Sequence, residues 1–233
     1  ATALGVLLAA AAASLWSLAP VSIGCGLLLV ALLFTVQAAQ LSALCARLPV
    51  PVIPAPGDPA PSAPSLRVLE DLPRRIRAGD SHQTGFIAAG VLLAVLGSVA
   101  VVWPAVSGAG ATSPCAWYLV VAAALGAALR ARVWDSAPCK AWLLGHSSLI
   151  TTVLLGLFAA TGNLTAAWWA LAALGALTAV WVVVALNPRI ARPDTYSLPV
   201  RRLLGFAAAG LDASLIPVMA YLVGLFAWVL NGL

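Results

Sequence analysis

Two ionisable side chains lie inside long apolar runs, where a charge is costly and therefore informative about function. Asp212 falls within the last apolar segment, and His146 lies near the start of the segment that begins at Lys140. A carboxylate and an imidazole at these depths can relay protons or ions, provided that a second titratable group lies close by. The structural alternative is that Asp212 is capped by Ser214, an arginine or a neighbouring helix, or is protonated.

Small hydroxyl residues follow His146 and favour a packing role for this segment. Ser147 and Thr151, and likewise Ser148 and Thr152, share a helix face at i, i+4 spacing. Such residues promote close helix contacts and hydrogen bonds between helices in membranes. No second histidine, cysteine pair or carboxylate lies at metal-ligand spacing from His146. We therefore expect no metal site there.

The sequence contains none of the short motifs that mark common catalytic or cofactor sites. A glycine-rich phosphate loop, a nucleophile elbow and the HExxH pattern are all missing from it. Small-xxx-small pairs at Ala122/Gly126 and Gly205/Ala209 indicate close helix packing and nothing more. We expect no catalytic residue and no cofactor, and we do not expect an enzyme.

The composition is that of an all-α integral membrane protein. The chain is 63% hydrophobic and 8% charged, with a mean hydropathy of +1.04, which leaves too few charges to cover a water-facing surface. Its 12 basic and 7 acidic residues give a net charge of +5. The cations fall in three clusters, Arg47–Arg77, Arg130–Lys140 and Arg189–Arg202. This positive-inside pattern predicts cytoplasmic loops rather than nucleic-acid binding.

Seven apolar runs predict seven transmembrane helices. Their ranges are 1–17, 20–46, 84–102, 115–129, 140–161, 165–186 and 203–231. The chain then divides into two helices at 1–46, a proline-rich basic loop at 47–83 and five helices at 84–233. Prolines forbid a continuous helix in the loop, and its unpaired backbone must lie outside the hydrocarbon. Within the loop, leucines at helical spacing predict a short helix near 65–77.

The charge clusters predict one topology. The chain starts in the cytoplasm, the loops after the second, fourth and sixth spans are cytoplasmic, and the C-terminus lies outside. Because the chain begins at Ala1 and enters an apolar run without a signal-peptide pattern, we expect it to be the C-terminal part of a longer protein.

The four cysteines divide between the two predicted faces. Cys45 and Cys139 face the reducing cytoplasm, whereas Cys25 and Cys115 lie near the outer side. The outer pair forms either a disulfide or two buried free thiols.

Three stretches of the sequence together resemble one known family of membrane proteins. The run RLPVP at 47–51, followed by VIP, is similar to the family's exit from a central helix. The run RARVWD at 130–135 is similar to its short basic loop, although Ser136 stands where the family has arginine. The run SLPVRR at 197–202, with Ile216-Pro217 further on, is similar to its closing segment. In order and spacing these stretches resemble the EccD family, the polytopic subunit of type VII (ESX) secretion systems, over essentially the whole chain.

The resemblance implies a structural scaffold in a bacterial inner membrane. EccD-like proteins pair as two copies, enclose a wide membrane cavity and hold the ATPase EccC together with EccB and EccE. The expected partners are therefore a second EccD-like copy, EccC-like, EccB-like and EccE-like subunits and membrane lipids. The candidate contact residues are Arg47, Pro49, Pro51, Pro54, Arg74, Arg75, Arg77, Arg130, Arg132, Arg201 and Arg202. The rival hypothesis is a small-solute or ion-coupled transporter that uses Asp212 and His146.

Overall fold

The computed structural model describes residues 19–47, 66–187 and 197–231, and these residues fold into helices joined by short turns. The helices are α2 (Pro20–Cys45), α3 (Leu66–Val101), α4 (Trp103–Ser107), α5 (Pro114–Arg130), α6 (Ala137–Ala160), α7 (Leu164–Leu186), α9 (Leu198–Leu222) and α10 (Leu225–Asn231). The predicted helix at 1–17 and the candidate contacts Pro49, Pro51 and Pro54 lie outside the described residues. The all-helical prediction holds for the part of the chain that the structure describes.

Five of these helices are long and apolar enough to cross a membrane, namely α2, α3, α6, α7 and α9. Helix α5 is also apolar but has only 17 residues. These six helices overlap six of the seven predicted spans; the bounds of α2, α5, α6 and α7 differ from the prediction by a few residues, whereas those of α3 and α9 differ more. The start of α2 at Pro20 follows the expected preference of proline for the first helical turn.

Helix α3 is longer than predicted. Residues 66–101 form one continuous 36-residue helix, whereas two helices near 65–77 and 84–102 were expected. The sequence between them contains no proline, and the helix tolerates Gly79 because an interior glycine costs only about 1 kcal/mol. Pro73 also lies within the helix. At ~1.5 Å per residue α3 reaches about 54 Å, well beyond a hydrocarbon core of ~30 Å.

Two helix ends differ from the predicted ones, and each lies at a glycine with left-handed backbone. Residues 103–107, expected to close a helix and open a loop, form the short helix α4, which stops at Gly108 with φ of 69°. The last predicted helix, 203–231, is instead α9 and α10, separated at Gly224 with φ of 79°. Left-handed backbone suits glycine and ends a helix. Helix α9 also starts five residues earlier than expected, because extended Ser197 and early Pro199 form a favourable N-terminus.

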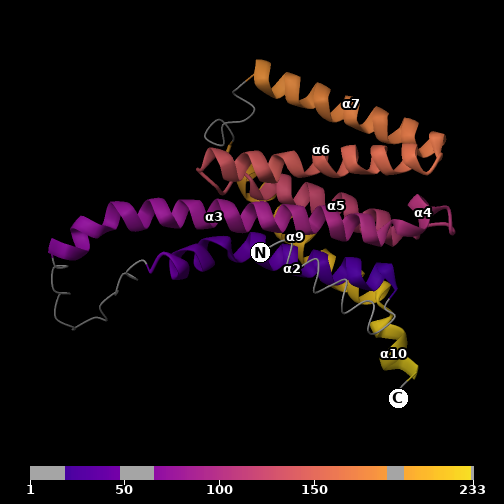
Figure 1. Cartoon of the computed structure of the whole chain (residues 1–233), viewed down its shortest axis with the longest axis horizontal. Helices are drawn as coiled ribbons and strands as arrows, with labels where there is room; N and C mark the ends of the chain where they lie inside the picture. Colours follow the sequence, from indigo (N-terminus) through magenta and orange to yellow (C-terminus); the bar gives the residue numbers. More distant parts are fainter. Residues whose placement is uncertain (1–18, 48–65, 188–196, 232–233) are drawn as a thin grey trace.

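Helices α2 and α3 form an antiparallel hairpin with very close backbones (Figure 1). A Cβ added to Gly24 would lie 2.6 Å from the carbonyl oxygen of Gly97, and one added to Gly97 would lie 2.9 Å from that of Gly24. Further along, a Cβ on Gly90 would lie 2.6 Å from the Thr35 methyl group. Small residues allow this approach, which increases dispersion contact where no hydrophobic effect drives helices together in lipid.

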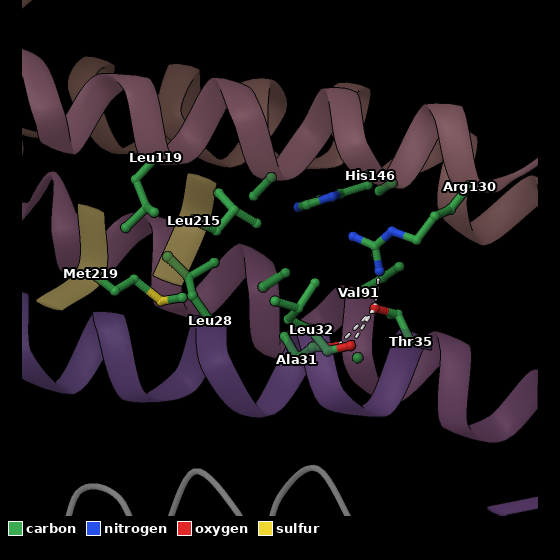
Figure 2. A pocket seen from close by; sticks show the side chains of 14 residues that line it. Leu28, Ala31, Leu32, Thr35, Val91, Leu119, Arg130, His146, Leu215 and Met219 are labelled. Carbon is green, nitrogen blue, oxygen red and sulfur yellow. Dashed lines mark hydrogen bonds between the residues drawn. The ribbon is translucent and has the colours of Figure 1, made fainter. Parts of the chain in front are cut away.

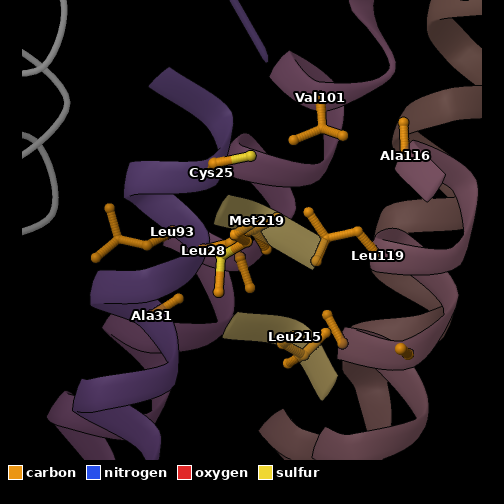
Figure 3. Packing of buried hydrophobic residues seen from close by; sticks show 12 residues of the cluster. Cys25, Leu28, Ala31, Leu93, Val101, Ala116, Leu119, Leu215 and Met219 are labelled. Carbon is orange, nitrogen blue, oxygen red and sulfur yellow. The ribbon is translucent and has the colours of Figure 1, made fainter. Parts of the chain in front are cut away.

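The core is built where α2, α3, α5 and α9 meet. Leu28, Leu93, Leu119 and Leu215, one from each of these helices, belong with Met219 to one buried cluster, and Figure 3 shows Leu28, Leu119 and Leu215 around Met219. Two further clusters join α6 to α3 and α5. Helix α7 packs on the outside of α6 (Figure 1), and Ala167 is the one buried residue of this fully described helix.

Candidate functional sites: a buried polar cluster and a charged stalk

An ion pair joins α5 to α9 inside the bundle. The Arg130 Nη2 atom lies 3.3 Å from Asp212 Oδ1, and the two side chains are 14% and 21% exposed. Asp212 Oδ1 makes no aligned hydrogen bond within the described residues, so the contact is mainly electrostatic. Of the alternatives open for Asp212, the structure shows the arginine.

The Arg130 guanidinium has two further hydrogen-bond partners, one on α5 itself and one on α2. Arg130 Nε donates to the carbonyl oxygen of Gly126, one turn back, at 3.3 Å. Arg130 Nη1 donates to Thr35 Oγ1 on α2, and this hydroxyl in turn donates to the carbonyl oxygen of Ala31 at 3.0 Å. Arg130 therefore links three helices, α2, α5 and α9.

Gly126 is the residue that lets Asp212 come so close. A Cβ at this position would lie 2.9 Å from Asp212 Oδ1, which is shorter than real Cβ contacts. The predicted packing pair Ala122/Gly126 is buried in this α5–α9 contact, where Tyr118 Oη and Ser214 Oγ also lie 2.7 Å apart. By contrast, Gly205 has nothing within 4 Å of an added Cβ. Of the two predicted small-residue pairs, the first packs against a helix of this chain.

His146 lies beside this ion pair, in the centre of the bundle. Its side chain is 2% exposed, and neither ring nitrogen has a hydrogen-bond partner among the described residues. Figure 2 shows the imidazole and the Arg130 guanidinium pointing into the same small cavity, which has a volume of about 20 Å³. Thr35 also lines it, and the remaining wall is mostly apolar. The structure thus brings together groups that are far apart in sequence.

These polar groups do not form a metal centre. Within residues 19–47, 66–187 and 197–231, no three His, Cys, Asp or Glu side chains cluster closely enough to hold a metal ion. The cation already present, Arg130, would also repel a metal ion from the cavity. The four cysteines are free thiols, so of the two alternatives for Cys25 and Cys115 the structure shows the unpaired one.

The second candidate site is the stalk, defined as residues 66–83 of α3. Because α3 is too long for the bilayer and this end carries its charges, we infer that the stalk projects from the hydrocarbon. Arg74 and Arg75 lie 3.6 and 3.7 Å from the Asp71 carboxylate in exposed ion pairs. Arg75 also donates to the Arg47 carbonyl oxygen at 2.9 Å, which holds the end of α2 against the stalk.

The other basic candidates lie at the same end of the bundle as the stalk. The end of α2, the start of α3, the end of α5 and the end of α7 gather there, whereas α4 and the α6–α7 turn lie at the opposite end (Figure 1). The contact of Gly126 with Asp212 and of Leu119 with Leu215 brings the first half of α9 towards this end as well. The exposed candidates at this end are Arg47, Arg74, Arg77, Arg132, Arg201 and Arg202. Arg130 differs because its guanidinium points into the bundle.

Apolar helices packed through small residues, with a charged stalk at one end and a polar cluster inside, define a polytopic helical membrane domain. The chain belongs to the EccD family, because the model of the EccD-like transmembrane domain matches residues 1–232. The resemblance proposed from the three sequence stretches is therefore confirmed.

Named relatives show the same relationship. The chain is 66% identical over 230 residues to the ESX-3 secretion system protein EccD3 of Mycolicibacterium smegmatis, which covers 99% of this chain and 47% of that protein. The protein of the same name from Mycobacterium tuberculosis is 66% identical over 227 residues, or 97% of this chain and 47% of that protein. The chain thus spans about half the length of the curated relatives it matches.

A solved structure has the same fold. The structure of protomer 1 of the ESX-3 core complex matches with a TM-score of 0.85 and 63% sequence identity, covering 97% of this chain and 50% of that chain.

Proposed function

We propose that this chain is the membrane-embedded portion of a structural subunit of a type VII (ESX) secretion complex, and that it is a scaffold rather than an enzyme. The observation that carries the proposal is the match to protomer 1 of the ESX-3 core complex at 63% identity and a TM-score of 0.85. The names of the relatives support the same system.

The proposed partners divide between two surfaces. A second copy, and the membrane helices of EccB-like and EccE-like subunits, pack against lipid-facing helices such as α7, whose large side chains are left uncovered by this chain. The EccC-like ATPase docks at the basic end, on the stalk and the neighbouring arginines. This end faces the cytoplasm in our proposal and the C-terminus lies outside, in agreement with the positive-inside rule.

The test is to reverse the charge of the stalk in the full-length protein. The triple variant Arg74→Glu, Arg75→Glu and Arg77→Glu is expressed at its native level with an affinity tag, extracted in mild detergent and measured for the mass and composition of what co-purifies. We expect the parent protein to elute in a large particle with the ATPase and two copies of itself, and the triple variant to lose the ATPase.

The matched control replaces the same three arginines by lysine, which retains the charge. We expect this variant to keep its partners, since electrostatic docking depends on the sign of the charge. Cysteine labelling of the basic end checks that the glutamate variant keeps its orientation in the membrane. If the parent protein elutes without partners, or the glutamate variant retains all of them, the scaffold proposal loses its support.

The transporter hypothesis makes a different prediction for Asp212. If Asp212 relays ions, Asp212→Asn abolishes solute uptake and leaves the complex assembled. If the chain is a scaffold, Asp212→Asn removes the ion pair with Arg130 and lowers the stability of the protein. Solute uptake is then unchanged. Measuring both quantities on one variant separates the two hypotheses.

A further inference from the structure

The cavity beside His146 has the size of a single small ligand. Its volume of about 20 Å³ exceeds the ~10–15 Å³ that a water molecule needs. The residues that line the cavity come from α2, α3, α5, α6 and α9.

The polar lining sets the chemistry of the ligand. Arg130 carries five N–H donors, and its partners in the described chain are Gly126, Thr35 and Asp212. The imidazole of His146 adds a nitrogen acceptor or donor that has no partner among the described residues. Cavities that stay dry are lined by apolar groups alone, whereas a water molecule needs two or more polar partners. Arg130, His146 and Thr35 supply that number.

The charges of Arg130 and Asp212 exclude small cations and disfavour small anions as ligands of this cavity. Arg130 repels a cation, and Asp212 already balances the charge of Arg130 at 3.3 Å, so an anion gains little there. A neutral molecule that both donates and accepts hydrogen bonds fits all of the lining groups. Figure 2 shows the His146 imidazole and the Arg130 guanidinium directed into the cavity, with a hydrogen bond drawn from Arg130 to Thr35.

We propose that this cavity is a buried water site, in which one water molecule bridges the His146 imidazole of α6 to the Arg130 guanidinium of α5 and the Thr35 hydroxyl of α2. The water extends the Arg130–Asp212 pair into a network that joins four helices, α2, α5, α6 and α9. It also satisfies a buried polar ring, which packing alone leaves unpaired. This inference does not depend on the proposed function.

The test uses the full-length protein in its membrane complex, in lipid nanodiscs, studied by electron cryomicroscopy at a resolution that shows ordered water. We expect one density peak at about 2.7–3.2 Å from a ring nitrogen of His146 and from Arg130. A cavity without density, in a map that shows other buried waters, overturns the proposal. So does a His146 ring that donates directly to a protein carbonyl group.

Two variants make the assignment specific. His146→Gln keeps a polar group and is expected to retain the peak, whereas His146→Phe fills the space with an apolar ring and is expected to lose it. The matched control is His82→Phe, on the exposed part of the stalk, which should leave the peak unchanged. Retention of the peak in His146→Phe contradicts a site built on the imidazole.

A second measurement keeps the proposal testable if His146→Phe does not assemble. In membranes of the isotopically labelled protein, magnetisation transferred from water to the His146 side chain is measured by solid-state nuclear magnetic resonance. We expect early transfer to His146, and a several-fold weaker transfer in Thr35→Val, which keeps the side-chain shape but removes a water ligand. Transfer no faster than to the buried Leu143 side chain overturns the proposal.

Discussion

Of the polar contacts described above, the Arg130–Asp212 ion pair is the one whose removal should destabilise the folded protein most. We consider three variants of the full-length protein, namely Arg130→Met, Asp212→Leu and the double variant. Each single change leaves one charged group without its partner in a largely buried position. The double change replaces both by apolar side chains that the surrounding leucines and alanines accept. The two single variants should therefore be less stable than the double variant.

The magnitude follows from the geometry. Unit charges 3.3 Å apart attract by about 5 kcal/mol at an effective dielectric constant near 20 and by about 1.3 kcal/mol in bulk water. Side-chain exposures of 14% and 21% place this pair nearer the first value. Breaking a buried pair costs ~3–5 kcal/mol, and replacing both partners is often neutral. Polar contacts in membranes are weaker, at most ~1.7 kcal/mol in one double-mutant survey. We expect each single variant to lose about 1.5 kcal/mol and the double variant about 1 kcal/mol, which gives a coupling energy of about 2 kcal/mol.

The assay is equilibrium unfolding in mixed micelles by titration with a denaturing detergent, followed by tryptophan fluorescence. The control is the same cycle on the exposed stalk pair, with Asp71→Leu and Arg74→Met. Those side chains are 47% and 81% exposed and 3.6 Å apart, so we expect coupling below about 0.5 kcal/mol. If the buried pair couples no more strongly than the stalk pair, the structural role assigned to Arg130 is refuted.

Two further predictions concern glycines at close contacts, and the same assay checks both. Gly24→Ala should lower the free energy of unfolding by about 1–3 kcal/mol because its methyl group meets the backbone of Gly97. Gly26→Ala, two residues along on an open face, should be neutral or slightly stabilising. Equal effects of the two substitutions would contradict the α2–α3 packing. Gly126→Ala should destabilise by displacing the Asp212 carboxylate from Arg130, and should cost less when Asp212 is already alanine. Additive effects would contradict that explanation.

Much of the helical framework could be predicted from the sequence because its boundaries are local. Pro20 starts α2, Asn163 caps α7 by accepting from the Ala166 amide at 3.3 Å, and apolar runs of sufficient length lie between such signals. The helix boundaries that were predicted wrongly also have local causes. The polar residues after Arg77 read as a loop, but none of them is proline and each costs at most about 1 kcal/mol in a helix, so α3 continues through them.

The candidate site was only partly predictable because its partners are far apart in sequence. Asp212 and His146 were identified from the sequence as ionisable groups in apolar runs, and in the structure Asp212 pairs with Arg130 while His146 lines the same cavity as Arg130. Thr35 was not singled out, since a lone threonine in an apolar helix usually bonds its own backbone, as Thr35 also does to Ala31. Nothing in the sequence pattern pairs position 130 with position 212; the packing of α5 against α9 does so.

The length of α5 explains why Arg130 differs from the other basic residues. At ~1.5 Å per residue its 17 residues reach about 25 Å, which is less than a ~30 Å hydrocarbon core. A helix that is too short draws its terminal residues towards the bilayer, and a charge there must be paired or must reach the interface. Arg130, in the last turn, is held inward by Gly126, Thr35 and Asp212, whereas Arg132, beyond the helix end, is exposed. The short helix therefore accounts for the inward position of Arg130, and the packing of α5 against α9 supplies Asp212 as its acidic partner.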